Sequence, residues 1–142
     1  GGSRGNPGPA GAGAVIADKK GQTLKKVSKY LGEQTNNWAE YEAVILGLQT
    51  LKRVFGKEKI KNFDIEVKMD SELVMEQLSH TYQIKEEGLV PQFIKIHNMR
   101  IADFPNITFI HIPREKNSEA DALANKAMDE GNGPKQTCLP PA

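Results

Sequence analysis

The chain begins with a glycine-rich stretch, Gly1-Gly2-Ser3-Arg4-Gly5-Asn6-Pro7-Gly8-Pro9-Ala10-Gly11-Ala12-Gly13, which contains six glycines and two prolines. Glycine tolerates positive φ and close contact, while proline fixes its own φ and restricts the residue before it. The stretch leads directly into the strand-like segment 14–18. We therefore expect a tight turn that passes close to another group. Such a turn is typical of the second half of a hairpin, whose first strand is not part of this sequence.

The composition is that of an ordinary globular domain. Of 142 residues, 38% are hydrophobic and 26% are charged, with 19 basic against 18 acidic side chains, so we expect one domain with a real core. This charge balance indicates no particular partner, and a nucleic-acid binder would depend on local basic patches. The single cysteine, Cys138, excludes an internal disulfide, and no apolar run could span a bilayer. We expect a cytoplasmic protein without a membrane partner.

Hydrophobic periodicity predicts a mixed α/β fold. Alternating apolar residues indicate strands over 13–17, 23–32, 63–69 and 107–112. Helical spacing indicates a central buried helix over 37–55, helices over 70–79 and 118–130, and a further helix with Pro91 in its first turn. Glycine and proline then predict a flexible end. The expected organisation is a domain over 1–130 and a flexible tail over 131–142.

Three acidic residues occupy similar places in this pattern. Glu40, Asp70 and Asp121 each lie in the first turn or at the cap of a predicted helix. Each also has a purely structural explanation. Glu40 and Asp121 fit the third position of capping boxes that begin at Asn37 and Ser118, and Asp70 fits an N-cap. Capping and a shared functional site therefore both remain open for these three acids.

Capping does not explain the small residues around Glu40. Ala43 and Gly47 share its helical face, so this helix could approach the sheet closely and carry Glu40 inward, where an acid is costly unless it is paired. Three converging carboxylates without matching buried cations favour a divalent metal with oxygen ligands, Mg²⁺ or Mn²⁺. Zinc is disfavoured because the three histidines lack metal-ligand spacing; they are His80, His97 and His111.

Four motifs, found in order over about the first 130 residues, resemble type 1 ribonuclease H. They are Gly1-Gly2-Ser3-Arg4-Gly5-Asn6-Pro7-Gly8-Pro9, Thr35-Asn36-Asn37-Trp38-Ala39-Glu40-Tyr41, Met69-Asp70-Ser71 and Asn117-Ser118-Glu119-Ala120-Asp121-Ala122-Leu123-Ala124-Asn125. The resemblance implies a mixed five-stranded sheet flanked by helices. It also implies a metal-dependent endoribonuclease that hydrolyses the RNA strand of RNA/DNA hybrids, with two Mg²⁺ ions, replaceable by Mn²⁺, held by four carboxylates.

The resemblance assigns roles to individual residues. Three of the four metal ligands would be Glu40, Asp70 and Asp121. The backbone of the glycine-rich turn and the side chains of Asn6, Glu40 and Ser71 would lie near the RNA strand. Thr35, Asn36 and Asn37 would face phosphates, and Asn36 and Asn37 could also reach base edges or sugars. The substrate-binding residues that the resemblance implies are Gly1, Gly2, Ser3, Asn6, Thr35, Asn36, Asn37 and Ser71. Shape and the 2′-hydroxyls would select the substrate. Whether double-stranded RNA is also a partner stays open.

Two departures from the family matter. The family's first carboxylate is an aspartate immediately before the position of Gly1, at the end of the central first strand, and neither is in this sequence. We therefore expect an opened sheet and impaired hydrolysis if the chain starts at Gly1, and a monomer unless that strand is supplied in trans. Where many relatives carry a catalytic histidine, this loop carries Arg114, which could hold a phosphate but could not shuttle protons.

The alternative to an active nuclease is a hybrid-binding module that keeps the fold but has lost catalysis. A dinucleotide-binding loop is a third interpretation of the glycines. It is disfavoured because the glycines lead into a strand, whereas the dinucleotide fingerprint opens a helix.

Overall fold

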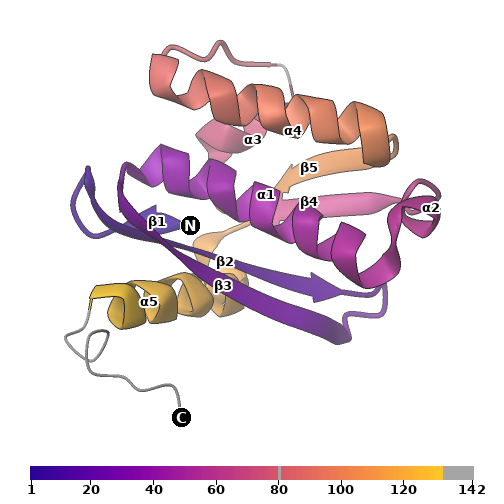
Figure 1. Cartoon of the computed structure of the whole chain (residues 1–142), viewed down its shortest axis with the longest axis horizontal. Coiled ribbons are helices and arrows are strands. Elements are labelled where there is room, and N and C mark those ends of the chain that lie inside the picture. The colour runs from indigo at the N-terminus through magenta and orange to yellow at the C-terminus, as the bar shows by residue number, and fades with distance from the viewer. Residues whose placement is uncertain (80, 133–142) are drawn as a thin grey trace.

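The computed structural model, drawn in Figure 1, describes residues 1–79 and 81–132. Within these residues the chain forms a mixed α/β fold, as the sequence predicts. The strands are β1 (Gly2–Ser3), β2 (Gly8–Ala17), β3 (Thr23–Gln34), β4 (Ile65–Met69) and β5 (Ile107–His111). The α-helices are α1 (Asn36–Phe55), α2 (Lys57–Ile60), α3 (Glu72–Leu78), α4 (Val90–Asp103) and α5 (Ser118–Asn132), with short 3-10 turns at Glu87–Leu89 and Arg114–Asn117.

The strands form two sheets. β1, β2 and β3 make an antiparallel sheet in that order, and β4 pairs in parallel with β5. In the described part of the chain no hydrogen-bonded ladder joins the two sheets, so the expected opened sheet is observed. The short strand β1 was not predicted, because two residues among glycines show no apolar alternation. It pairs Gly2 with Gly11 and Ser3 with Ala10.

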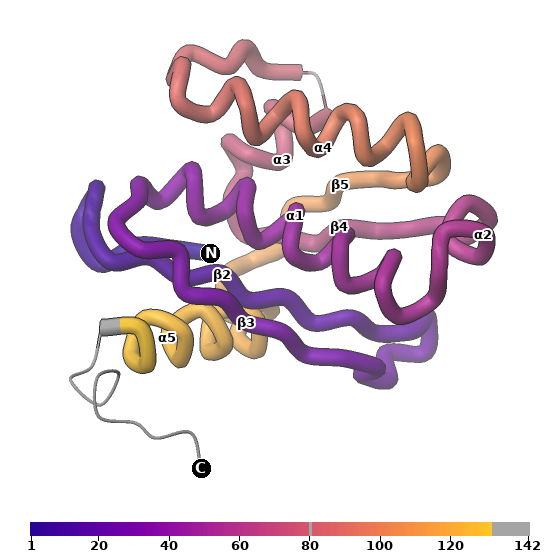
Figure 2. Tube along the Cα trace, viewed as in Figure 1, coloured from indigo at the N-terminus to yellow at the C-terminus, as the bar shows by residue number. Residues whose placement is uncertain are grey.

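Helices α1 and α5 cover opposite faces of the β2–β3 pair, which the Cα trace in Figure 2 shows clearly. Alternation along β2 explains this arrangement, since successive residues face opposite sides of a sheet. A Cβ at Gly13 would point at α5, 2.5 Å from the Ala120 carbonyl oxygen, whereas Ala14 meets α1 at Gly47. The predicted central helix is confirmed, because its apolar face is buried in the core at Tyr41, Val44, Ile45 and Leu48.

Several predicted boundaries were wrong. β2 begins at Gly8, well before the predicted start at residue 13. The prediction missed its first half because glycine and alanine are poor strand formers and give no strand signal. The short helix α2, which follows α1, was not among the predicted elements. Helix α5 continues through Asn132, so residues 131 and 132 belong to the helix and not to the predicted tail. The rest of that tail, 133–142 with Cys138, lies outside the described residues, as does His80. None of the described helices is long and apolar enough to cross a membrane.

The contact between Gly13 and α5 predicts a measurable cost for added volume. The Gly13→Ala variant should lose about 1–3 kcal/mol of unfolding free energy in urea titration. A Cβ there would meet the backbone of α5, which cannot move aside as a flexible side chain would.

Gly88→Ala is the matched control, because a Cβ at Gly88 meets nothing within 4 Å. This variant should change stability by no more than about 0.5 kcal/mol. Equal effects at the two positions would show that the close approach of α5 does not constrain the fold.

Candidate active site

A polar cleft of about 350 Å³ brings most of the predicted site residues together. It is lined by Glu40 from α1, Asp70 from the end of β4, Asp121 from α5 and Arg114 from the 3-10 turn before α5. Of the predicted substrate-binding residues, Gly1, Gly2, Ser3, Asn36, Asn37 and Ser71 also line it. Residues far apart in the sequence thus meet at one concave surface, which is the usual form of a ligand site.

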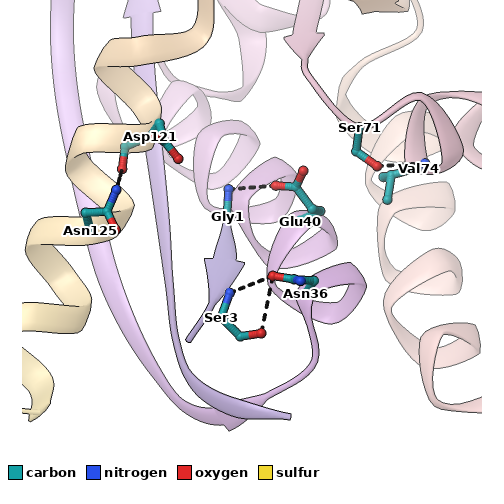
Figure 3. Close-up of polar contacts among 8 residues, drawn as sticks. All are labelled: Gly1, Ser3, Asn36, Glu40, Ser71, Val74, Asp121 and Asn125. Carbon is teal, nitrogen blue, oxygen red and sulfur yellow. Dashed lines mark hydrogen bonds and ion pairs between the residues drawn. The ribbon is translucent and has the colours of Figure 1, made fainter. Parts of the chain in front are cut away.

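Glu40 is drawn inward by helix α1. The N-cap of α1 is Thr35, whose Oγ1 accepts from the Trp38 amide at 3.2 Å, so the capping box proposed from Asn37 to Glu40 was wrong. The Glu40 side chain is only 17% exposed, and its Oε1 lies 2.7 Å from the Gly1 amino nitrogen (Figure 3). Gly1 itself packs on the backbone carbonyl of Ala39, where a Cβ would clash. The Glu40 carboxylate therefore lies next to the glycine-rich segment.

Burial makes Glu40 an expensive anion. It raises the pKa of the Glu40 carboxyl above its usual value, against the opposing effect of the Gly1 amino group, and the neighbouring Asp70 carboxylate raises it further. A largely buried carboxylate next to a second carboxylate is stabilised when a cation lies beside it. The arrangement therefore favours cation binding next to Glu40.

Asp70 follows β4 directly and precedes helix α3. The cap of α3 is Ser71, whose Oγ accepts from the Val74 amide at 3.2 Å, so the capping explanation of Asp70 was wrong. Ser71, predicted to bind substrate, has this structural duty in addition to its place in the cleft. Because Asp70 directly follows β4, its carboxylate lies at the end of the β4–β5 sheet. There it interacts with the Glu40 carboxyl.

Asp121 reaches the cleft from the first turn of α5. Residues Arg114–Asn117 form a 3-10 turn that leads into the helix, so Ser118 is already helical and is not the N-cap of a capping box. The backbone carbonyl of Asp121 accepts a hydrogen bond from Asn125 Nδ2 at 3.1 Å. In the view of Figure 3, Gly1 lies between Asp121 and Glu40.

These carboxylates fit a magnesium ion only in part. Among residues 1–79 and 81–132, no three His, Cys, Asp or Glu side chains stand close enough together to form a metal site by themselves. Mg²⁺, however, is usually bound through one or two carboxylates together with water and substrate phosphates. Glu40 and Asp70, which interact with each other, could provide such carboxylates, and Asp121 lines the same cleft.

Hydrogen bonds tie the glycine-rich segment to the start of α1. Asn36 Oδ1 accepts from the Ser3 amide at 2.8 Å and from Ser3 Oγ at 3.2 Å, and the Asn36 amide donates to Asn6 Oδ1 at 3.0 Å. Asn37 Nδ2 donates to Glu86 Oε1 at 2.8 Å. Asn6 and Thr35 do not line the cleft. Their side chains hold the loop and the helix end that form its wall.

The sequence prediction did not single out several residues of the cleft. They are Arg4, Asn117, Ala124, Asn125 and Met128. Helical spacing from Asp121 could have found Asn125, which lies four residues later on the same face of α5. No sequence signal pointed to Arg4, because its partners lie more than a hundred residues away.

Comparison with known proteins establishes the family. Residues 1–127 match the family described as reverse transcriptase-like. A protein of Pseudomonas fluorescens named ribonuclease H is 31% identical over 96% of this chain and 93% of its own length. The chain belongs to the type 1 ribonuclease H family. A bifunctional protein of Mycobacterium tuberculosis is 40% identical over 91% of this chain, which spans only about a third of that relative's length, 34%.

A solved ribonuclease H agrees in fold. The crystal structure of LC11-RNase H1, isolated from compost by a metagenomic approach, was determined in complex with an RNA/DNA hybrid. It matches with a TM-score of 0.89 and 49% identity over 93% of this chain and 94% of that one. The predicted ribonuclease H-like fold is therefore confirmed.

The bonds between Ser3 and Asn36 predict local protection of the glycine-rich segment. In Asn36→Ala the Ser3 amide loses its acceptor, and about 1 kcal/mol of local stability with it. Amide hydrogen exchange at Ser3 should therefore be roughly five times faster, as measured by NMR.

The neighbouring variant Asn37→Ala is the control, since the Asn37 side chain bonds to Glu86 and not to the segment. Exchange at Ser3 should stay unchanged in that variant. Similar acceleration in both variants would mean that Asn36 has no particular role in holding the segment.

Proposed function

We propose that this chain hydrolyses the RNA strand of RNA/DNA hybrids endonucleolytically. The observation that carries the proposal is the meeting of Glu40, Asp70 and Asp121, from three separate elements, in one cleft beside the glycine-rich segment. Relatives named ribonuclease H and a similar enzyme crystallised with an RNA/DNA hybrid support the same substrate.

Magnesium is the cofactor that these residues would hold. Glu40 and Asp70 would be its inner carboxylates, with Asp121 contributing from α5, and their oxygen donors also suit Mn²⁺. When bound in pairs, such ions activate the attacking water and stabilise the leaving 3′ oxygen. This assignment is consistent with the buried Glu40 carboxylate, for which a nearby cation offsets the cost of burial.

Residues of the chain itself would position the substrate. Gly1 and Gly2 present bare backbone in the cleft wall, so a nucleic-acid strand can approach the chain closely at these two residues. Arg114 is an exposed residue of the same cleft lining, where its guanidinium can bind a phosphate through two parallel hydrogen bonds. Selection of RNA would come from its 2′-hydroxyl groups and the shape of the hybrid.

A hybrid-binding module without hydrolysis is the second candidate. The observation that favours it is that the three carboxylates share a cleft without forming a close trio among the described residues. The two candidates differ in one measurement, which is Mg²⁺-dependent cleavage of a hybrid with labelled RNA. The assay compares the 142-residue chain with a version in which a strand ending in aspartate precedes Gly1, as the family resemblance implies. Binding without cleavage in both versions would favour the module.

Asp70 provides the most direct test of the metal role. We expect Asp70→Asn to lower kcat by about a hundredfold or more, because a metal-bound carboxylate contributes several kcal/mol to lowering the barrier. Folding should be nearly intact, since Ser71 and not Asp70 caps α3. Cleavage of the labelled hybrid and thermal unfolding measure the two effects.

The control is the same substitution at the other end of the same strand. Asp64 is exposed just before β4 and lies outside the cleft, so Asp64→Asn should keep full activity. Unchanged turnover in Asp70→Asn would refute a metal-binding role for this residue.

A further inference from the structure

One cation in the cleft wall has no role in the site described so far. Arg4 lies in the connection between β1 and β2, and its Nη1 is 2.7 Å from Asp129 Oδ1 on α5. Its Nη2 is 3.4 Å from both the carbonyl oxygen and Oδ1 of Asn125. Arg4 and Asn125 both line the cleft that contains the three carboxylates. The guanidinium is therefore held against α5 within the cleft wall.

The spacing of residues along α5 shows how far Arg4 lies from Asp121. Asp121, Asn125 and Asp129 follow one another at four-residue intervals, so they lie on one face of the helix. At 1.5 Å per residue, Asp129 lies about 12 Å along the axis from Asp121. A nucleic-acid strand that passes Asp121 in this direction would bring a phosphate other than the scissile one to Arg4.

The charges that line the cleft mean that a contact between Arg4 and a phosphate would favour substrate binding. Three carboxylates line it and repel a polyanion, whereas Arg4 and Arg114 are the cationic side chains in its described lining. The Arg4–Asp129 pair is exposed, at 44% and 66% for the two side chains. Exposed pairs of this kind add little to stability. A phosphate, which the guanidinium can bind through two parallel hydrogen bonds, can therefore replace Asp129 at small cost.

We propose that Arg4 binds a backbone phosphate of the nucleic-acid substrate away from the scissile bond, exchanging Asp129 for that phosphate. This inference rests on the proposed function and adds a substrate-binding residue to it. Because Arg4 acts at a distance from the reacting phosphate, it contributes to KM and to the salt dependence of binding. The turnover number kcat does not depend on it.

The test measures binding of a fluorescently labelled RNA/DNA hybrid in EDTA across a series of salt concentrations. Arg4→Gln should raise Kd roughly threefold to tenfold and reduce the slope of log K against log[salt] by about 1, as expected for one lost phosphate contact. Asp129→Asn should lower Kd, because it releases Arg4 from its competing carboxylate. In cleavage assays with Mg²⁺, Arg4→Gln should raise KM and leave kcat unchanged.

Lys26→Gln is the matched control. Lys26 Nζ pairs with Glu119 Oε2 of the same helix at 3.1 Å, with side chains 51% and 60% exposed, but Lys26 does not line the cleft. This variant removes one positive charge from a similar ion pair, and should leave the Kd and the salt slope close to those of the unmodified chain.

A purely structural ion pair gives a different pattern. In that case Arg4→Gln and Asp129→Asn would both weaken binding, or both leave it unchanged, and either result overturns the proposal. The design separates this failure from failure of the proposed function. Hydrolysis with unaltered binding in Arg4→Gln overturns the role of Arg4 alone. Binding that depends on Arg4 without any hydrolysis overturns the proposed hydrolysis alone.

Discussion

The structure depends on how closely two helices approach the backbone of the glycine-rich strand. Where Gly13 faces α5 there is no room for a Cβ, and on the opposite face Ala14 lies against Gly47 of α1. Close approach of this kind increases the contact area between helix and sheet and brings helix ends near strand ends. Glu40 and Asp121 belong to these two helices, so the packing that stabilises the sheet also brings the two acids to one cleft.

The site carries an energetic cost that the surrounding structure offsets. Burial of Glu40 disfavours its negative charge, and the neighbouring Asp70 carboxylate adds to that cost. Caps that do not involve these acids stabilise the neighbouring helices, with Thr35 at α1 and Ser71 at α3. The carboxylates are thereby left available for chemistry. A carboxylate buried at such a cost in a cleft is typical of functional sites.

Prediction from the sequence succeeded where a signal was local and periodic. Helical spacing over 37–55 predicted the buried helix α1, and the alternation before Asp70 predicted β4. It failed where the signal was not periodic, as in β2, where a strand built of glycine, proline and alanine resembled a turn. The capping interpretations at Asn37 and Asp70 failed because Thr35 and Ser71, two residues and one residue away, were equally good caps, and only the observed start of each helix shows which residue is used. The one at Ser118 failed because a 3-10 turn already leads into α5.

The sequence by itself determined the fold class, the four motifs and the identity of the three acids. Each of these can be recognised from a pattern of residues that are close together along the chain. Only the tertiary structure decided that these acids share a cleft and that Asn6 and Thr35 hold its walls instead of lining it. It also decided that Arg4 lies against Asn125 and Asp129. Contacts between residues more than a hundred positions apart depend on how α5 packs across the sheet, and no local pattern specifies that packing.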